Sequence, residues 1–442
     1  MRRRRLIVVL VTAVLGVAAV YAGWLIFQPG PYDFAGGHSV DLGAYRGPSP
    51  TGIPPDLTST DARARGEYIA RMADCEACHT ARGGRAFAGG RPFVLPFGTI
   101  YTPNITPDAD TGVGKWSDAQ FIRAVHRGIS ADGSRLYPAF PYASYTLLSD
   151  ADVLAIKSYL FSIKPIRQAN RPNTFSFPFN QRWLMGFWSA FFNSDERFRP
   201  IPERSPQWNR GAYLVEAAGH CGECHTPRNL LQAMDQRQKF AGGVAEGWSA
   251  YNITSDPVSG VGDWSVAELT SYLRNGHARG RGGASGPMGE AVDLSLSKLT
   301  HSDVDAIAAY VRSVKPIRSD ALPKPAAAAA ESPSVASIDN PQGKLIFEGN
   351  CLSCHSWTGA GAILDAAQLT GTRAVNDASA TNVAHVILSG FGSVDSGRPF
   401  MPSFSDAYSD AEIAAVANYV TARFGSKASG LTPDRVAMLR MQ

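Results

Sequence analysis

All six cysteines of this 442-residue chain lie in three copies of one five-residue motif, C-x-x-C-H. The copies read CEACH at 75–79, CGECH at 221–225 and CLSCH at 351–355. Two thiols three positions apart lie about one helical turn from each other, and a histidine follows directly. Since no cysteine is left over, the fold must present this arrangement three times.

This spacing is typical of covalent attachment of a c-type haem. Each thiol can add to one vinyl group of the same porphyrin, and the adjacent histidine then lies under the ring, where it can bind the iron. A zinc site gives no reason for a histidine after every pair, and three disulfides would each close a strained four-residue ring. The sequence therefore predicts three covalently bound haem c groups, held by Cys75, Cys78 and His79; by Cys221, Cys224 and His225; and by Cys351, Cys354 and His355.

Composition places the rest of the chain among ordinary globular proteins. Hydrophobic residues make up 44% of it and charged residues 18%, and the formal net charge is +4. That charge is small, and no basic stripe alternates with aromatic residues, so we expect no nucleic-acid partner. The length predicts about two to four domains.

The N-terminus predicts a membrane anchor. Four arginines, Arg2 to Arg5, precede an apolar run from Leu6 to Phe27, which as a helix would span roughly 33 Å. The positive-inside rule then places the chain in the inner membrane by a single N-terminal helix, with its haem domains on the periplasmic side. The alternative is a signal peptide cleaved before Gly23, which exports the same domains.

The chain between these features contains an internal repeat. RGEYIARMADCEACH from Arg65 resembles RGAYLVEAAGHCGECH from Arg210, and a third, weaker copy starts at Gly343. Each copy ends in a helical pattern, as expected for small α domains built around a haem. We therefore predict an all-α fold of three tandem cytochrome c domains after the transmembrane helix. The predicted divisions are an anchor at 1–30, domain one at 55–170, a connector at 171–205, domain two at 206–318, a Pro/Ala linker at 319–340, domain three at 341–426 and a polar tail at 427–442.

The second axial ligand of each iron is expected in a loop before the last helix of its domain. A methionine thioether is the usual choice in electron-transfer cytochromes, and Met288 and Met401 stand in such loops. Counted from the matching residues Trp116 and Trp264, however, domain one has Phe140 where domain two has Met288.

Phenylalanine cannot bind iron, so two hypotheses stay open for the first haem. In one, His126 is its sixth ligand, although it aligns with Arg274 rather than with a ligand position. In the other, the first iron is open or water-bound and Phe140 covers its distal face. A spectrum of the first haem distinguishes them, because an open iron is high-spin.

Taken together, the motifs GHCGECHTPRN, LYPAFPY and MPSF, with the three C-x-x-C-H copies, resemble the membrane-bound tri-haem cytochrome c subunits of bacterial periplasmic dehydrogenases. The resemblance covers residues 60–425. It implies a catalytic partner subunit with a flavin, quinone or molybdenum centre, association with the membrane, and ubiquinone or another respiratory acceptor. Many members read LYPAMPY, and the Phe form resembles subunits that accompany molybdenum-dependent aldehyde or N-heterocycle oxidoreductases.

The sequence indicates no substrate site of its own. It contains no paired catalytic carboxylates in one motif, no Gly-rich nucleotide fingerprint and no nucleophile elbow. We therefore predict a non-catalytic electron-transfer subunit. The alternative is a haem enzyme whose open domain-one iron binds a small ligand such as peroxide.

Overall fold

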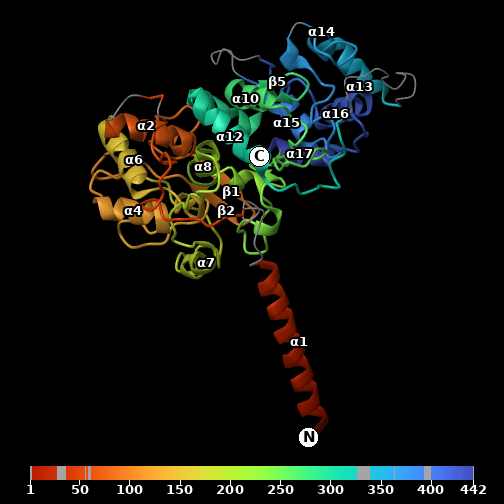
Figure 1. Cartoon of the computed structure of the whole chain (residues 1–442). Helices are drawn as coiled ribbons and strands as arrows, with labels where there is room; N and C mark the ends of the chain where they lie inside the picture. Colours follow the sequence, from red (N-terminus) through yellow and green to blue (C-terminus); the bar gives the residue numbers. More distant parts are fainter. Residues whose placement is uncertain are drawn as a thin grey trace.

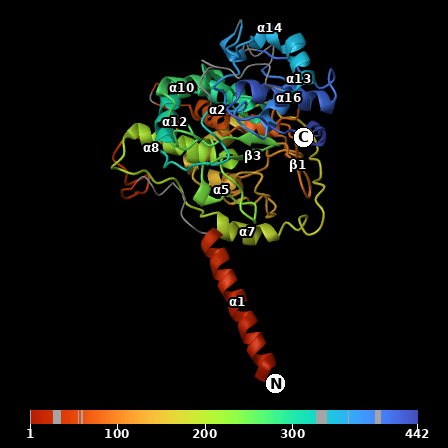
Figure 2. The ribbon, with the colours of Figure 1, turned by 90° about the vertical axis from the view of Figure 1, so that its right-hand side faces the viewer.

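The computed structural model describes residues 2–26, 36–54, 56–57, 61–325, 339–362, 364–392 and 400–441. These residues form a mostly helical body from which one long helix, α1 (Arg2–Ile26), extends (Figures 1 and 2). The alanine-rich part of the predicted linker, 326–338, lies outside the described residues.

The predicted membrane anchor over residues 1–30 is wrong. Among the helices of the described residues, none is long and apolar enough to cross a membrane. The prediction treated Leu6 to Phe27 as one uniform apolar helix, whereas α1 begins within the arginine run and ends at Ile26. The predicted location, an inner membrane with the haem domains on its periplasmic side, rested on this anchor and falls with it.

The body repeats one helix crossing three times. In each case a first helix, just before a C-x-x-C-H motif, packs against a closing helix far along the chain. We refer to these segments as unit one, unit two and unit three. The pairs are α2 (Ala62–Met72) with α6 (Asp150–Ser162), α8 (Pro206–Tyr213) with α12 (His301–Ser313), and α13 (Pro341–Ile346) with α16 (Asp410–Phe424).

A glycine makes each crossing possible. A Cβ atom added to Gly66, Gly211 or Gly343 would lie 1.8, 2.0 or 2.4 Å from a backbone carbonyl of the closing helix. The carbonyls belong to equivalent alanines in the three closing helices. Any side chain at these positions would force the two helices apart, so the glycines bring both backbones into contact.

The chain between the crossing helices contains short β-strands as well as helices, whereas the sequence predicted an all-α fold. The described residues contain three two-stranded antiparallel hairpins: β1 (Pro92–Leu95) with β2 (Gly98–Tyr101), β3 (Gly243–Ala245) with β4 (Trp248–Ala250), and β5 (His277–Ala278) with β6 (Gly282–Gly283). The remaining helices are α4 (Asp118–Arg127), α5 (Tyr142–Tyr145), α7 (Leu184–Phe192), α10 (Val266–Asn275), α11 (Gly286–Leu294), α15 (Thr381–Ser389) and α17 (Pro433–Arg440).

Units one and two share a single hydrophobic core, whereas unit three has its own. The second core includes two residues of α17, Val436 and Leu439, which are almost fully buried. The C-terminal residues predicted as a polar tail thus form a helix whose apolar side completes unit three. The prediction missed this because it took the whole segment 427–442 as polar, although α17 contains four consecutive apolar residues, Val436 to Leu439.

Units one and two also exchange hydrogen bonds between buried groups. The Tyr68 hydroxyl donates to Asp303 Oδ2 of unit two, and the Tyr213 hydroxyl donates to Asp152 Oδ2 of unit one, both at 2.6 Å. Each carboxylate also accepts from an arginine of its own unit. We call this arrangement the reciprocal Tyr–Asp pair.

Candidate haem-binding site

Each C-x-x-C-H motif forms a single helical turn, α3 (Cys75–His79), α9 (Gly222–His225) and α14 (Leu352–His355). In units two and three a π-helical turn precedes the motif, at Leu214–Ala218 and Phe347–Cys351. In unit one, Asp74 in a left-handed conformation takes that place, with φ of 50°. In unit three the helix runs without a break from Pro341 through the π-helical turn to His355, whereas in units one and two it stops before the motif.

The three motif histidines share one hydrogen bond. The Nδ1 atoms of His79, His225 and His355 lie 2.7, 2.6 and 2.6 Å from the carbonyl oxygens of Pro103, Tyr251 and Ala367. Since a carbonyl only accepts, Nδ1 carries the proton and donates. Each Nε2 therefore keeps its lone pair, as an imidazole that binds a metal through Nε2 must.

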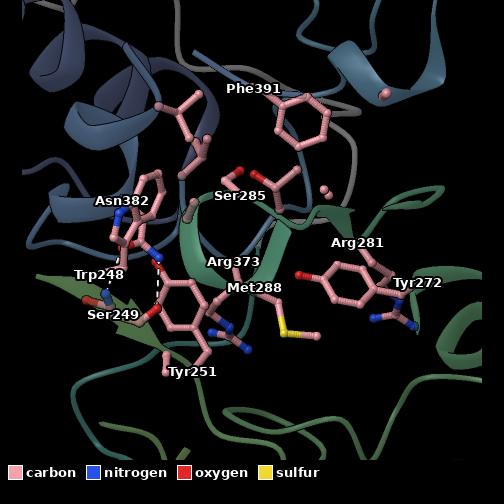
Figure 3. A pocket seen from close by; sticks show the side chains of 18 of the residues that line it. Trp248, Ser249, Tyr251, Tyr272, Arg281, Ser285, Met288, Arg373, Asn382 and Phe391 are labelled. Atoms are coloured by element: carbon pink, nitrogen blue, oxygen red, sulfur yellow. Dashed lines mark hydrogen bonds between the residues drawn. The ribbon is translucent and has the colours of Figure 1, made fainter. Parts of the chain in front are cut away.

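A cavity of about 530 Å³ lies over the second and third motifs. Its wall includes His225 and His355, together with both predicted methionine ligands, Met288 and Met401. Figure 3 shows the Met288 side chain in this cavity, beside Arg373 and Tyr251. One cavity is thus lined by His225 and Met288 of unit two and by His355 and Met401 of unit three.

The cysteines of the motifs are free thiols, of which five are partly buried and Cys354 is exposed. No disulfide joins any of the six, all of which the structure describes. Burial raises the pKa of Cys75 and Cys221 to about 12, so these thiols carry no charge at neutral pH. Within the described residues no cluster of three or more His, Cys, Asp or Glu side chains could hold a metal ion. Unpaired thiols, a free Nε2 and a cavity with a thioether together fit a haem c.

Unit one differs from this arrangement. Phe140 packs edge-on against Tyr145, with the ring centroids 5.5 Å apart. Tyr145 in turn packs edge-on against His220 of unit two at 5.3 Å. The Phe140 side chain is therefore part of an aromatic contact that leads towards the second motif.

His126 is a fully buried residue of α4 that lies near the start of the closing helix of unit one. Its Nδ1 atom is 3.6 Å from Asp150 Oδ1 of that helix. Burial, followed by the nearby positive charge of Arg197, lowers the pKa of His126 to about 4. Asn193 Nδ2 donates to the His126 backbone carbonyl at 2.8 Å, whereas neither ring nitrogen of His126 has a hydrogen-bond partner among the described residues.

The repeated NIT segments predict asparagines that either fix the loop or contact haem propionates, and the hydrogen bonds show the first of these roles. Asn104 Oδ1 accepts from the backbone N–H of Thr106, and its Nδ2 donates to the Ile166 carbonyl at 2.7 Å. Asn252 makes the equivalent bonds to Thr254 and Ile317. These asparagines tie the loop that follows the histidine-binding carbonyl to the chain after the closing helix. The signal was present in the repeat, because both copies contain the same three letters.

The fold and these sites define a c-type cytochrome. A family model of cytochrome c matches residues 63–164, and a model of the cytochrome c oxidase, cbb3-type, subunit III matches residues 339–420. Haem c is therefore the cofactor of this fold, and electron transfer is its role.

Comparison with known proteins gives the family. The chain is 35% identical over 399 residues to the gluconate 2-dehydrogenase cytochrome c subunit of Pantoea cypripedii, covering 85% of this chain and 89% of that one. It is 36% identical over 419 residues to the fructose dehydrogenase cytochrome subunit of Gluconobacter japonicus, and this match covers 88% of this chain and 85% of that one. The chain belongs to this family of dehydrogenase cytochrome c subunits.

A third relative is longer. The chain is 42% identical over 383 residues to a nicotinate dehydrogenase subunit of Pseudomonas putida. The match covers 84% of this chain but spans only 31% of that protein.

Proposed function

We propose that this protein carries three covalently bound haem c groups, one in each unit, and passes electrons through them from a dehydrogenase catalytic subunit to ubiquinone or another respiratory acceptor. The observation that carries the proposal is the shared hydrogen bond from Nδ1 of His79, His225 and His355 to a backbone carbonyl. The same donor geometry in all three units supports the same role in each. When bound, haem c supplies a reversible one-electron change at its iron.

The proposed ligands follow from the site. His79, His225 and His355 bind the iron of the first, second and third haem, and their adjacent cysteine pairs form the thioether links. Met288 and Met401 complete the second and third irons, because both line the cavity that contains the two histidines.

We propose a first haem without a protein ligand on its distal side. Phe140 occupies the position equivalent to Met288, and His126 aligns with Arg274 rather than with a ligand position, its Nδ1 lying 3.6 Å from Asp150 Oδ1. The relatives are cytochrome subunits rather than haem enzymes, so a peroxide-binding enzyme is not favoured.

The catalytic partner is proposed from the relatives. Gluconate, fructose and nicotinate dehydrogenases each have a related subunit. The similarity to the nicotinate dehydrogenase protein, together with the LYPAFPY sequence, favours a partner that oxidises an N-heterocycle or an aldehyde. The partner's centre would be molybdenum in that case, and flavin or quinone in the others.

Haem counting tests the proposal. The pyridine haemochrome spectrum and the intact mass of the purified chain should give three haems per protein. Replacing both cysteines of one motif by alanine should remove one haem in each of the three variants. A wild-type chain with two haems, or a motif variant that keeps all three, contradicts it.

A further inference from the structure

The carbonyl that orients His225 comes directly after strand β4, and unit three holds that strand in place. Tyr251 directly follows β4, and its carbonyl oxygen lies 2.6 Å from Nδ1 of His225. The position of this carbonyl therefore sets the direction in which the imidazole points. Any group that fixes β4 also fixes the histidine.

Unit three supplies such groups on both sides of this carbonyl. The Ser249 N–H donates to Asn382 Oδ1 at 2.8 Å, and Asn382 Nδ2 donates back to the Ser249 carbonyl at 2.9 Å. The Tyr251 hydroxyl donates to Asp377 Oδ2 at 3.2 Å. Asn382 lies on α15, and Figure 3 shows its paired hydrogen bonds to β4.

A ring stack reinforces these hydrogen bonds. Trp248 of β4 stacks on His385 of α15, with centroids 4.6 Å apart and an interplanar angle of 15°. His385 Nε2 also lies 3.2 Å from the Gly247 carbonyl oxygen. Asn382 and Asp377 are both largely buried, so water does not compete freely for their bonds.

Unit one holds the equivalent strand in a different way. The Tyr101 N–H, two residues before the carbonyl that binds His79, donates to Asn173 Oδ1 at 3.1 Å. Asn173 belongs to the connector that follows unit one. Thr174 of the same connector exchanges hydrogen bonds with Thr99. The two strands thus use the same acceptor, an asparagine oxygen, but unit two takes it from another unit.

We propose that unit three completes the second haem site, with Asn382 and Asp377 acting as positioning residues for the axial ligand His225. Docking of unit three then sets the electronic state of the second haem as well as bringing the third haem close to it. This inference rests on the proposed binding of a haem at His225.

The test uses the full-length, haem-loaded protein. Asn382→Ala removes the paired hydrogen bonds to Ser249, and Asp377→Ala and Tyr251→Phe each remove the bond from the Tyr251 hydroxyl. Paramagnetic NMR of the oxidised protein reports the methyl resonances of each haem, and a Met288→His variant assigns those of the second. We expect the second-haem resonances to shift in all three variants. We also expect its reduced-to-oxidised ratio at a fixed potential to change by about threefold, a smaller factor than the roughly tenfold or more that losing a direct hydrogen-bond partner of a ligand typically costs in metal affinity or activity.

A rescue variant and a double variant distinguish a positioning role of these residues from a general loosening of the interface between units two and three. Asp377→Asn keeps an acceptor for the Tyr251 hydroxyl and should restore the wild-type resonances. Asp377→Ala removes the acceptor of the Tyr251 hydroxyl and also that of the Ser379 N–H, so the double variant Tyr251→Phe with Asp377→Ala should equal Asp377→Ala alone. The matched control is Asn173→Ala in unit one, which should shift the first haem and leave the second unchanged.

The outcomes are distinct. Second-haem resonances that stay at their wild-type positions in Asn382→Ala and Tyr251→Phe overturn the inference, as does an equal shift of the first haem. A wild-type chain without a haem at His225 overturns the proposed function instead, and haem counting on the same samples detects that case.

Discussion

Units one and two form a pair, whereas unit three is attached to that pair by its surface. The pair shares one hydrophobic core and the reciprocal Tyr–Asp pair. In unit three, Leu345 stands where Tyr68 and Tyr213 stand, and its side chain is 70% exposed. Unit three instead contacts unit two through polar groups, for example Arg373 Nη2 with the Val258 carbonyl at 2.7 Å.

This difference predicts two levels of cooperativity. A shared core must open as a whole, because neither unit can expose its half without exposing the other. A separate core joined by hydrogen bonds and a ring stack resembles a domain interface, which can open alone. We therefore expect units one and two to unfold together and unit three to unfold in its own transition.

The largest loss of stability is expected when the reciprocal Tyr–Asp pair is broken. Asp303 is buried and accepts from the Arg210 guanidinium at 2.7 and 2.6 Å and from the Tyr68 hydroxyl. Asp303→Ala leaves the buried Arg210 charge without its carboxylate, which should cost about 3–5 kcal/mol. Urea unfolding followed by circular dichroism should show the loss in the transition of units one and two.

Unit three offers a matched control for this variant. Glu412 stands at the position of Asp303, but it only forms a capping box with Ser409 at the start of α16. Glu412→Ala should change stability far less, and only in the transition of unit three. Equal losses in both variants would show that the comparison between the units is wrong.

The second expected effect is that the stability of unit one depends on pH, because His126 is buried in it. Burial lowers the pKa of His126 to about 4, with Arg197 as the next cause, while Asp150 and Asp195 act in the opposite direction. The unfolded chain takes up a proton near pH 6.5 and the folded chain does not, so stability falls as pH drops from 6.5 towards 4. The loss amounts to about 3 kcal/mol at the lower end.

His126→Leu should remove this part of the pH dependence without changing the spectrum of the first haem. Urea unfolding at pH 7 and at pH 4.5 measures the first expectation, and the absorption spectrum of the oxidised protein measures the second. A spectrum that turns high-spin in His126→Leu would instead identify His126 as the sixth ligand.

The third effect concerns the helix crossings. Alanine favours a helix over glycine by about 1 kcal/mol, but its Cβ would meet the Ala155 carbonyl in Gly66→Ala and the Ala415 carbonyl in Gly343→Ala. We expect a net cost of about 1–3 kcal/mol, larger at Gly66 because the approach is closer. Gly66→Ala should lower the transition of the pair, and Gly343→Ala only that of unit three. A shift of both transitions in Gly343→Ala would contradict separate unfolding.

The sequence predicted the features that are local. Cysteine spacing, the repeated NIT segment and the helical patterns after Leu148 and Leu299 depend on neighbouring residues, and the structure places α6 and α12 on those two patterns. The glycines of the crossings were visible in the repeat as RG and QG, but their purpose was not, because it depends on a carbonyl far away in the chain.

The features that sequence reasoning missed depend on contacts between units. Nothing local distinguishes Asn382 from any other polar residue of an amphipathic helix, yet it holds the strand before Tyr251. The role of α17 was also missed, because burial of its Val436 and Leu439 depends on the core of unit three against which they pack, and that core comes from residues distant in the sequence. The N-terminal anchor was predicted from local features as well, namely the apolar run, its length and the arginines before it, and it was wrong, because no described helix is long and apolar enough to cross a membrane.

The smallest effect on stability, and the sharpest spectroscopic one, is expected from Phe140→Met. The two side chains are similar in volume, so the change should cost less than about 1.5 kcal/mol. It places a thioether where unit two has Met288, and should convert the first haem from high-spin to low-spin and abolish carbon monoxide binding to its reduced form. Met288→Phe is the reciprocal variant and should give the second haem the properties of the first. If the wild-type first haem is already low-spin and binds no carbon monoxide, Phe140 does not mark an open iron. The difference between units one and two at this position would then concern packing against Tyr145 alone.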